Sequence, residues 1–282
     1  MGVAVQSHWF SVGSVVSWAR AGTGAVATQS VAEVAYGPRV LDRLAAGEDA
    51  TSALRAELDA DASARVRQVA VVDAHGRVAV HTGEDCIAHA GHENGEQFSC
   101  QANMMARETV PAAMAAAFRE SPQSALPERL MMALRAAEGE GGDIRGRQSA
   151  AMVVVPAVGD PWATRVDLRV EDHPDPLGEL ERILGLQRAY ELAGQADEVL
   201  GAGDADTASR LYVRASELAP DSDELLFWAG LSIAHIGDLQ TGTEMVERAA
   251  EVNPDWLVLL DRLSPEFAPS GEAVRGRLRG VG

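Results

Sequence analysis

The chain has no lysine, and all 24 of its basic residues are arginines. Because arginine stays protonated at physiological pH, no side-chain amine can form a Schiff base or act as a tunable amine base. The 42 acidic residues outnumber the basic ones and give the 282-residue chain a net charge of −18. A nucleic-acid partner would need a basic surface. We therefore predict a protein that neither binds nucleic acid nor uses lysine chemistry.

Cysteine and long apolar runs are also scarce. Cys86 and Cys100 are the two cysteines, too few for a disulfide framework. No apolar run approaches the ~18 residues that a membrane-spanning helix needs. The N-terminus also lacks the basic residue and apolar core of a secretory signal. From these absences we expect a cytoplasmic protein with no membrane partner.

Apolar periodicity divides residues 1–175 into alternating strands and helices, as expected for an α+β domain. The predicted strands cover residues 2–5, 24–29, 66–72, 77–81, 149–155 and 164–171. The predicted helices form two pairs, at about 37–46 and 49–60 and at about 109–119 and 127–137. Gly76 allows a tight hairpin turn between the third and fourth strands. This order favours antiparallel sheets covered by helices.

The chain becomes almost wholly helical from residue 176, after Pro174 and Pro176. A pattern then recurs at a constant offset of 34 residues, the period of a tetratricopeptide helix pair. Gly203-Asp204, Ala208, Tyr212, Ala215 and Pro220 return as Gly237-Asp238, Gly242, Val246, Ala249 and Pro254. We predict a linker helix and two tetratricopeptide-like repeats over 176–268, followed by a flexible tail over 269–282.

A polar segment directly precedes the apolar run at 152–155. It reads Gly141-Gly142-Asp143-Ile144-Arg145-Gly146-Arg147-Gln148-Ser149-Ala150-Ala151. In an extended segment Arg145 and Arg147 point to opposite faces, so one of them could enter a pocket and bind a carboxylate or an amide carbonyl. The alternative is a structural ion pair with Asp143 or Asp172. Gln148 and Asn103 could orient a substrate amide or simply satisfy core hydrogen bonds.

Further motifs appear in a fixed order along the same part of the chain. They are Ser7-His8-Trp9-Phe10-Ser11-Val12-Gly13, Trp18-Ala19-Arg20-Ala21-Gly22, Gly24-Ala25-Val26-Ala27-Thr28-Gln29, Tyr36-Gly37-Pro38-Arg39, His81-Thr82-Gly83, Cys86, Ala90-Gly91-His92, Gln101 with Asn103, and Asp167-Leu168-Arg169-Val170 before Asp172. With the polar segment they make residues 1 to about 186 resemble the family catalogued as domain of unknown function 1028. That family is placed among the Ntn-hydrolase-like proteins.

The resemblance implies a four-layer αββα sandwich that hydrolyses an amide bond of a small molecule or peptide. Ntn hydrolases use the side chain of their first residue as nucleophile and its free α-amine as base. Relatives begin about one strand earlier, and removal of Met1 here would expose Gly2, which carries no nucleophile. We expect the first strand and the nucleophile upstream of Met1. The alternative is a chain that has lost the chemistry, with Ser7 and Thr23 as weak internal substitutes.

Seven residues are the predicted pocket wall: Ser7, Thr28, Gln29, His81, Asn103, Asp143 and Arg145. His81 could be a general base near neutral pH or a structural histidine. Cys86, His89 and His92 imitate a metal-ligand spacing, but Gly91 and Gly95 favour a loop there, so we predict no metal. We predict no cofactor either, since the glycines around Thr23 lack the context of a dinucleotide fingerprint.

Two functions remain open at this point. One is an Ntn-type amidohydrolase with an interaction module, whose partners are a small-molecule or peptide substrate and a protein bound by the repeats. The other is a catalytically inactive ligand-binding or scaffold protein that kept the Ntn-like fold. A homodimer is compatible with both.

Overall fold

A computed structural model describes residues 1–280. The chain forms two compact units, Met1–Glu181 and Arg182–Gly282. The division falls within the long helix α6 (Pro176–Gly201), a few residues beyond the prolines at which we expected the boundary. Each unit is described by itself below.

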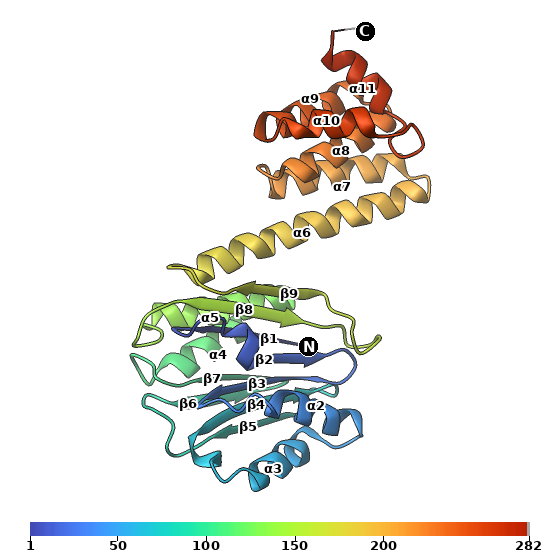
Figure 1. Ribbon diagram of the computed structural model, residues 1–282. Coiled ribbons are helices and arrows are strands. Elements are labelled where there is room, and N and C mark those ends of the chain that lie inside the picture. Colours follow the sequence, from blue (N-terminus) through green and yellow to red (C-terminus); the bar gives the residue numbers. More distant parts are fainter. Residues whose placement is uncertain (281–282) are drawn as a thin grey trace. The chain divides into compact units, whose positions relative to one another are not determined.

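One sheet of the first unit is continuous and antiparallel. Its strands, in spatial order, are β2 (Ser17–Arg20), β3 (Gly24–Ser30), β4 (Arg67–Asp73) and β5 (Val78–Thr82). Helices α2 (Tyr36–Ala45) and α3 (Ala50–Ala60) cover one face of this sheet (Figure 1). Val26, Val69 and Val71 point into the core between the sheet and these helices. The alternate residues of the same strands face the opposite side.

A second sheet layer packs on that opposite face. It contains the three-stranded sheet β1 (Gly2–Ser7), β8 (Ser149–Val154) and β9 (Val166–Val170), and the two-stranded sheet β6 (Gly91–Gly95) and β7 (Phe98–Ala102). Helices α4 (Val110–Glu120) and α5 (Leu126–Gly139) cover this layer on its outer side, α5 against β1 and α4 against β6 and β7. The first unit therefore has four layers in the order helices, sheet, sheet, helices.

The second sheet layer is interrupted between β1 and β7. β8 pairs with one edge of β1, and no strand within residues 1–280 pairs with the other edge. β7 likewise pairs only with β6 among the strands that the structure describes. The floor beneath this interruption is continuous, because β3 and β4 are neighbours in the first sheet. Residues on either side of the gap thus share the same supporting sheet, and the two helices that cover them, α5 over β1 and α4 over β7, pack against each other.

The second unit is a succession of helices. After α6 come α7 (Ala205–Leu218), α8 (Asp223–His235), α9 (Leu239–Val252), α10 (Asp255–Arg262) and α11 (Gly271–Leu278). Asp204 and Asp238 cap α7 and α9 in the same way, each accepting a backbone N–H three residues on at 3.0 Å. Gly242 of α9 crosses α8 at Gly230 so closely that a Cβ on either glycine would clash with the other's carbonyl oxygen. The 34-residue repeat therefore has a structural counterpart, and its assignment as tetratricopeptide remains a prediction.

The predicted α+β class is confirmed, and two local predictions need correction. Residues 91–95, expected as a loop, form β6, because Gly91 O accepts a hydrogen bond from the buried Gln68 amide and the strand pairs with β7. The expected flexible tail contains α11, which forms because Val274 is fully buried against the helices before it. Residues 281–282 of that tail lie outside the described part. No helix within residues 1–280 is long and apolar enough to cross a bilayer.

Candidate functional site

A cavity of about 900 Å³ occupies the interruption in the second sheet layer. Its floor contains Ala25, Ala27, Ala70 and Val72 of β3 and β4, and its roof contains Met114, Phe118, Leu130 and Leu134 of α4 and α5. All residues of β1 and of β7 line it, which shows that the cavity meets the edges of both strands and not one face alone. Cavities that bind small molecules commonly measure about 300–1,000 Å³ and have mostly apolar walls.

One end of the cavity is polar, and an ion pair forms its edge. The Arg145 guanidinium holds Asp143 through two hydrogen bonds, from Nη2 to Oδ2 at 2.6 Å and from Nε to Oδ1 at 3.0 Å. Arg145 Nη2 also lies 3.4 Å from Ser7 Oγ. The loop that carries the pair begins with Gly141 and Gly142, which have φ of +108° and +58°. Such backbone favours glycine, so the loop sequence is suited to its conformation.

The Asp143 carboxyl is almost wholly buried but stays ionised. Burial by itself raises its pKa. The hydrogen bonds from the Arg145 side chain and from the backbone N–H groups of Arg145 and His8 outweigh this effect, so the net pKa lies below the usual value. The structure thus shows Arg145 in the ion pair that the sequence left as an alternative, with its guanidinium at the cavity edge.

An amide network supports the same end of the cavity. Gln68 of β4 is fully buried, and its Oε1 accepts hydrogen bonds from Gln29 Nε2 at 2.8 Å and Asn103 Nδ2 at 3.1 Å. Gln68 Nε2 donates to the carbonyl oxygen of Ala102 in β7 at 3.0 Å. Gln68 therefore fixes two predicted site residues and one strand of the cavity wall. We did not predict it, although a glutamine inside the apolar run 66–72 is a signal of a buried polar role.

Two buried polar atoms, in residues that line the cavity, have no hydrogen-bond partner among the described residues. They are Gln6 Nε2 in β1 and Ser30 Oγ at the end of β3, and both atoms are buried. Ser30 also has a left-handed backbone with φ of +70°, which is uncommon for a residue with a side chain. Leaving a buried donor unsatisfied costs about 1–3 kcal/mol, so such groups are rare unless a ligand uses them.

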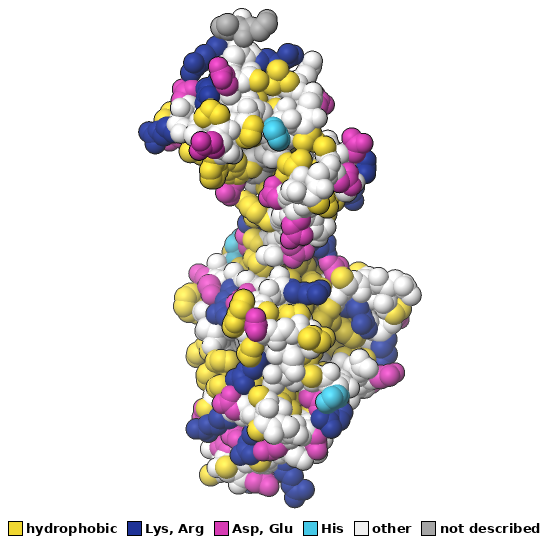
Figure 2. All heavy atoms as spheres, turned by 90° about the vertical axis from the view of Figure 1, so that its right-hand side faces the viewer, with side chains coloured by type: hydrophobic (Ala, Val, Ile, Leu, Met, Phe, Trp, Pro, Cys, Tyr) yellow, Lys and Arg dark blue, Asp and Glu magenta, His cyan; other side chains and the backbone are white. Residues whose placement is uncertain are grey.

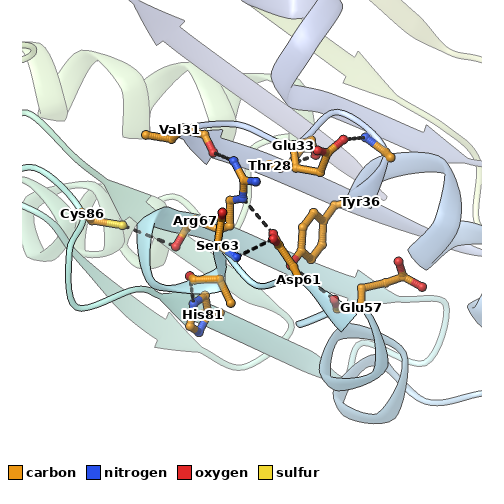
Figure 3. Close-up of polar contacts among 12 residues, drawn as sticks. Thr28, Val31, Glu33, Tyr36, Glu57, Asp61, Ser63, Arg67, His81 and Cys86 are labelled. Carbon is orange, nitrogen blue, oxygen red and sulfur yellow. Dashed lines mark hydrogen bonds and ion pairs between the residues drawn. The ribbon is translucent and has the colours of Figure 1, made fainter. Parts of the chain in front are cut away.

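Two of the predicted pocket residues, Thr28 and His81, lie elsewhere, in the cluster of polar contacts that Figure 3 shows. Thr28 Oγ1 donates to the carbonyl oxygen of Glu33 at 3.1 Å. The His81 ring nitrogen Nε2 lies 2.8 Å from the carbonyl oxygen of Ala64. Neither residue lines the cavity. His81 therefore has the structural role that the sequence left open, and it is not placed to act as a base at this site.

The centre of the cluster in Figure 3 is an ion pair between Arg67 and Asp61. Arg67 Nε donates to Asp61 Oδ2 at 2.8 Å, and this bond lowers the pKa of the Asp61 carboxyl. Burial and the negative charge of Asp61 raise the pKa of Tyr36, whose hydroxyl donates to the same oxygen at 3.2 Å. These bonds join the C-terminal end of α3 to β4, so the cluster has a structural role.

The remaining candidates from the sequence also have other partners. Cys86 Sγ donates to the carbonyl oxygen of Arg67, and His92 Nδ1 lies 2.9 Å from Thr82 Oγ1. Cys100 lines the cavity, but burial raises the pKa of its thiol to about 12, so the thiol stays protonated. Gln148 donates to Asp172 outside the cavity. Five of the seven predicted pocket residues line one cavity: Ser7, Gln29, Asn103, Asp143 and Arg145.

Comparison with known proteins confirms the resemblance seen in the motifs. The model of a family of unknown function (DUF1028) matches residues 1–180. The crystal structure of protein SPO2555 from Silicibacter pomeroyi, assigned to the same family, is similar to this chain with a TM-score of 0.58 and 30% sequence identity. The similarity covers 65% of this chain and 81% of that chain. No curated protein matches the chain. Because the family model matches well over half of its residues, the chain belongs to the DUF1028 family, whose function is unknown.

Proposed function

We propose that the first unit binds a small molecule or peptide with an apolar body and a polar, amide-like head. The observation that carries this proposal is the cavity itself, which is apolar over its floor and roof and polar at the end where Arg145, Gln29 and Asn103 lie. An amide offers both a hydrogen-bond acceptor and donors, which suit the guanidinium and amide side chains at that end. The alanines of the floor leave the space that the apolar body would fill.

Decanamide, a single amide on an apolar chain, is a direct probe of this proposal. We expect isothermal titration calorimetry to show binding at one site with a negative heat-capacity change, because apolar surface is buried. Ala70→Leu narrows the cavity from β4 and should weaken binding at least tenfold. Ala112→Leu, on the exposed side of α4, is the matched control and should bind like the unmodified protein. Equal binding by both variants, or no binding by the unmodified protein, contradicts the proposal.

Amide hydrolysis is a second candidate, since five residues predicted from the hydrolase resemblance line the cavity. Among the described lining residues, Ser7 is near Arg145, while no histidine is present and Asp143 is committed to its ion pair. This arrangement binds an amide more readily than it activates a hydroxyl. Release of decanoate and ammonia from decanamide, measured by mass spectrometry, separates the two functions: hydrolysis produces both, and binding alone produces neither.

The second unit is proposed to bind a protein partner, as its repeat pattern predicts. Paired helices with small residues at their crossings build such interaction surfaces in repeat proteins. The close crossing of α8 and α9 at Gly230 and Gly242 supports this part of the proposal. A pull-down with the full chain and with a Gly242→Leu variant tests it, because the variant should lose the partner and keep decanamide binding.

A further inference from the structure

The interruption between β1 and β7 is bounded on both sides by a strand edge that pairs with no other strand within residues 1–280. Both flanking sheets are antiparallel, rest on the β2–β5 sheet and are covered by α4 and α5. The cavity lining includes the floor, the roof and both strand edges. Free strand edges normally pair or are protected, because their N–H and C=O groups are a template for another strand. Here two such edges face one cavity.

The hydrogen-bond pattern of β1 shows which of its peptide groups face the cavity. Val155 N–H donates to Met1 O, and the Met1 nitrogen donates to Val155 O, both at 2.8 Å. In an antiparallel ladder such pairs alternate, so the peptide groups of Val3 and Val5 point to β8. Those of Ala4 and Gln6 therefore point to the opposite edge, toward the cavity.

The directions of the flanking strands agree with an odd number of inserted strands. His8, directly after β1, donates its N–H to Asp143 Oδ2, and Ile144 N–H donates to the carbonyl oxygen of Met104, just after β7. Both strands thus end at the same loop and run in the same direction. One strand antiparallel to both would complete the alternation found in every ladder of the described residues.

We infer that the cavity takes an extended peptide segment, which pairs with β1 on one side and β7 on the other. This inference rests on the proposed binding function and names its ligand class. The segment would be about six residues long, the length of β1 at about 3.4 Å per residue. Its amino end would lie at the polar end of the cavity, near Asp143, because it runs antiparallel to both strands. Floor and roof are both apolar, so the side chains on both of its faces should be apolar.

The test uses the full chain and a fluorescent peptide, Val-Ala-Val-Val-Ala-Val, with a free amino end and a carboxy-terminal tag of Gly-Arg-Arg that carries the dye. Fluorescence anisotropy should show saturable binding. The control peptide has the same tag, with proline at its second and fourth positions. Proline cannot donate a backbone hydrogen bond, so we expect its affinity to be at least tenfold lower. Equal affinity of the two peptides contradicts strand pairing.

A protein variant tests the same pairing from the other side. Ala4→Pro removes an N–H that faces the cavity and leaves the β1–β8 ladder intact, so the thermal unfolding midpoint should stay close to that of the unmodified protein while peptide affinity falls at least tenfold. Val5→Pro is the matched control for folding, since it removes a ladder N–H and should destabilise β1 itself. Unchanged peptide affinity in Ala4→Pro overturns the inference.

Orientation provides a measurement that needs no variant. A benzophenone on the first residue of the peptide should cross-link to the Asn103–Met105 segment, and one on the last residue to the segment around Gln97. Reversed cross-links, or cross-links outside the cavity, contradict the inference. If decanamide binds and the peptide does not, the cavity is a small-molecule site and the strand proposal fails alone. If neither binds, the proposed function fails as well.

Discussion

At the scale of single residues, two of the residues that line the cavity have features that lower the stability of the fold. Gln6 Nε2 and Ser30 Oγ are buried without a partner in the described chain, and Ser30 has a left-handed backbone. Both features oppose folding, and neither is explained by the packing around them. A site that binds a polar ligand group must keep its own polar atoms free, so stability and binding are opposed at these two positions.

Gln6→Leu should therefore raise stability and lower affinity. Leucine has nearly the volume of glutamine and removes the unsatisfied amide, so we expect unfolding in urea to require about 1 kcal/mol more. Decanamide binding should weaken about tenfold, which corresponds to ~1.4 kcal/mol. Gln148→Leu, which alters a partly exposed amide outside the cavity, should change neither quantity by much. A Gln6→Leu protein that is less stable and binds normally would show that the amide serves the fold.

Asp143 should contribute a pH-dependent part of the stability. Its pKa in the folded state is lowered by Arg145, so ionised Asp143 stabilises the fold at pH values above its unfolded pKa, about 3.9. This contribution is lost as the pH falls below about 4 and through the lower folded pKa. Asp143→Asn should cost about 1.5–3 kcal/mol at pH 7 and should flatten the stability profile below pH 4. Denaturation midpoints measured from pH 3 to pH 7 check both; parallel profiles for the two proteins would contradict the assignment.

At the scale of elements, helix crossings in the second unit depend on glycine. Gly242 touches the backbone of α8, whereas Gly194 of α6 has open space where a Cβ would lie. The same substitution should thus have opposite effects at the two positions. Gly242→Ala should destabilise the second unit by about 1–3 kcal/mol through overpacking. Gly194→Ala should stabilise it by about 0.5–1 kcal/mol, because glycine is a poor helix former. Urea denaturation followed by circular dichroism measures both stability changes. Changes of the same sign for the two variants would contradict the close crossing of α8 and α9.

The strands and helices that the sequence predicted are those with clear periodicity, such as β3, β4 and the pair α4 and α5. β6 was not predictable because its sequence is rich in glycine and polar residues. It forms by pairing with β7 and by the hydrogen bond that the Gln68 amide of a distant strand donates to Gly91 O. α11 was missed because its arginines and glycines obscure the helical pattern around its one buried apolar side chain, Val274. The site was predicted in part for the same reason: Asp143 and Arg145 are neighbours in sequence, while His81 could be placed only by the fold.

At the scale of the whole molecule, charge is spread and not concentrated. Acidic and arginine side chains are interspersed on the surface in view in Figure 2, although the net charge is −18. That face shows no large basic patch to which a polyanion could bind. The two units differ instead in their cavities, because the cavity of about 900 Å³ is lined entirely by residues of the first unit.

A ligand of the cavity should therefore stabilise the first unit selectively. At a decanamide concentration 100 times its Kd, the free energy of unfolding should rise by about 2.7 kcal/mol. Hydrogen exchange with mass spectrometry on the full chain at increasing urea separates the two units. We expect a higher midpoint for fragments from residues 1–181 and an unchanged midpoint for α8 and α9. Equal stabilisation of both would mean that the ligand does not act through this cavity alone.

The most direct test of the central claim is amide hydrogen exchange of β1 by NMR, with and without the Val-Ala peptide. The N–H groups of Ala4 and Gln6 face the cavity, and those of Val3 and Val5 already pair with β8. If a strand enters between β1 and β7, exchange at Ala4 and Gln6 should slow at least tenfold in the complex, and Val3 and Val5 should change less. Unaltered exchange at Ala4 and Gln6 in a saturated complex would contradict the account.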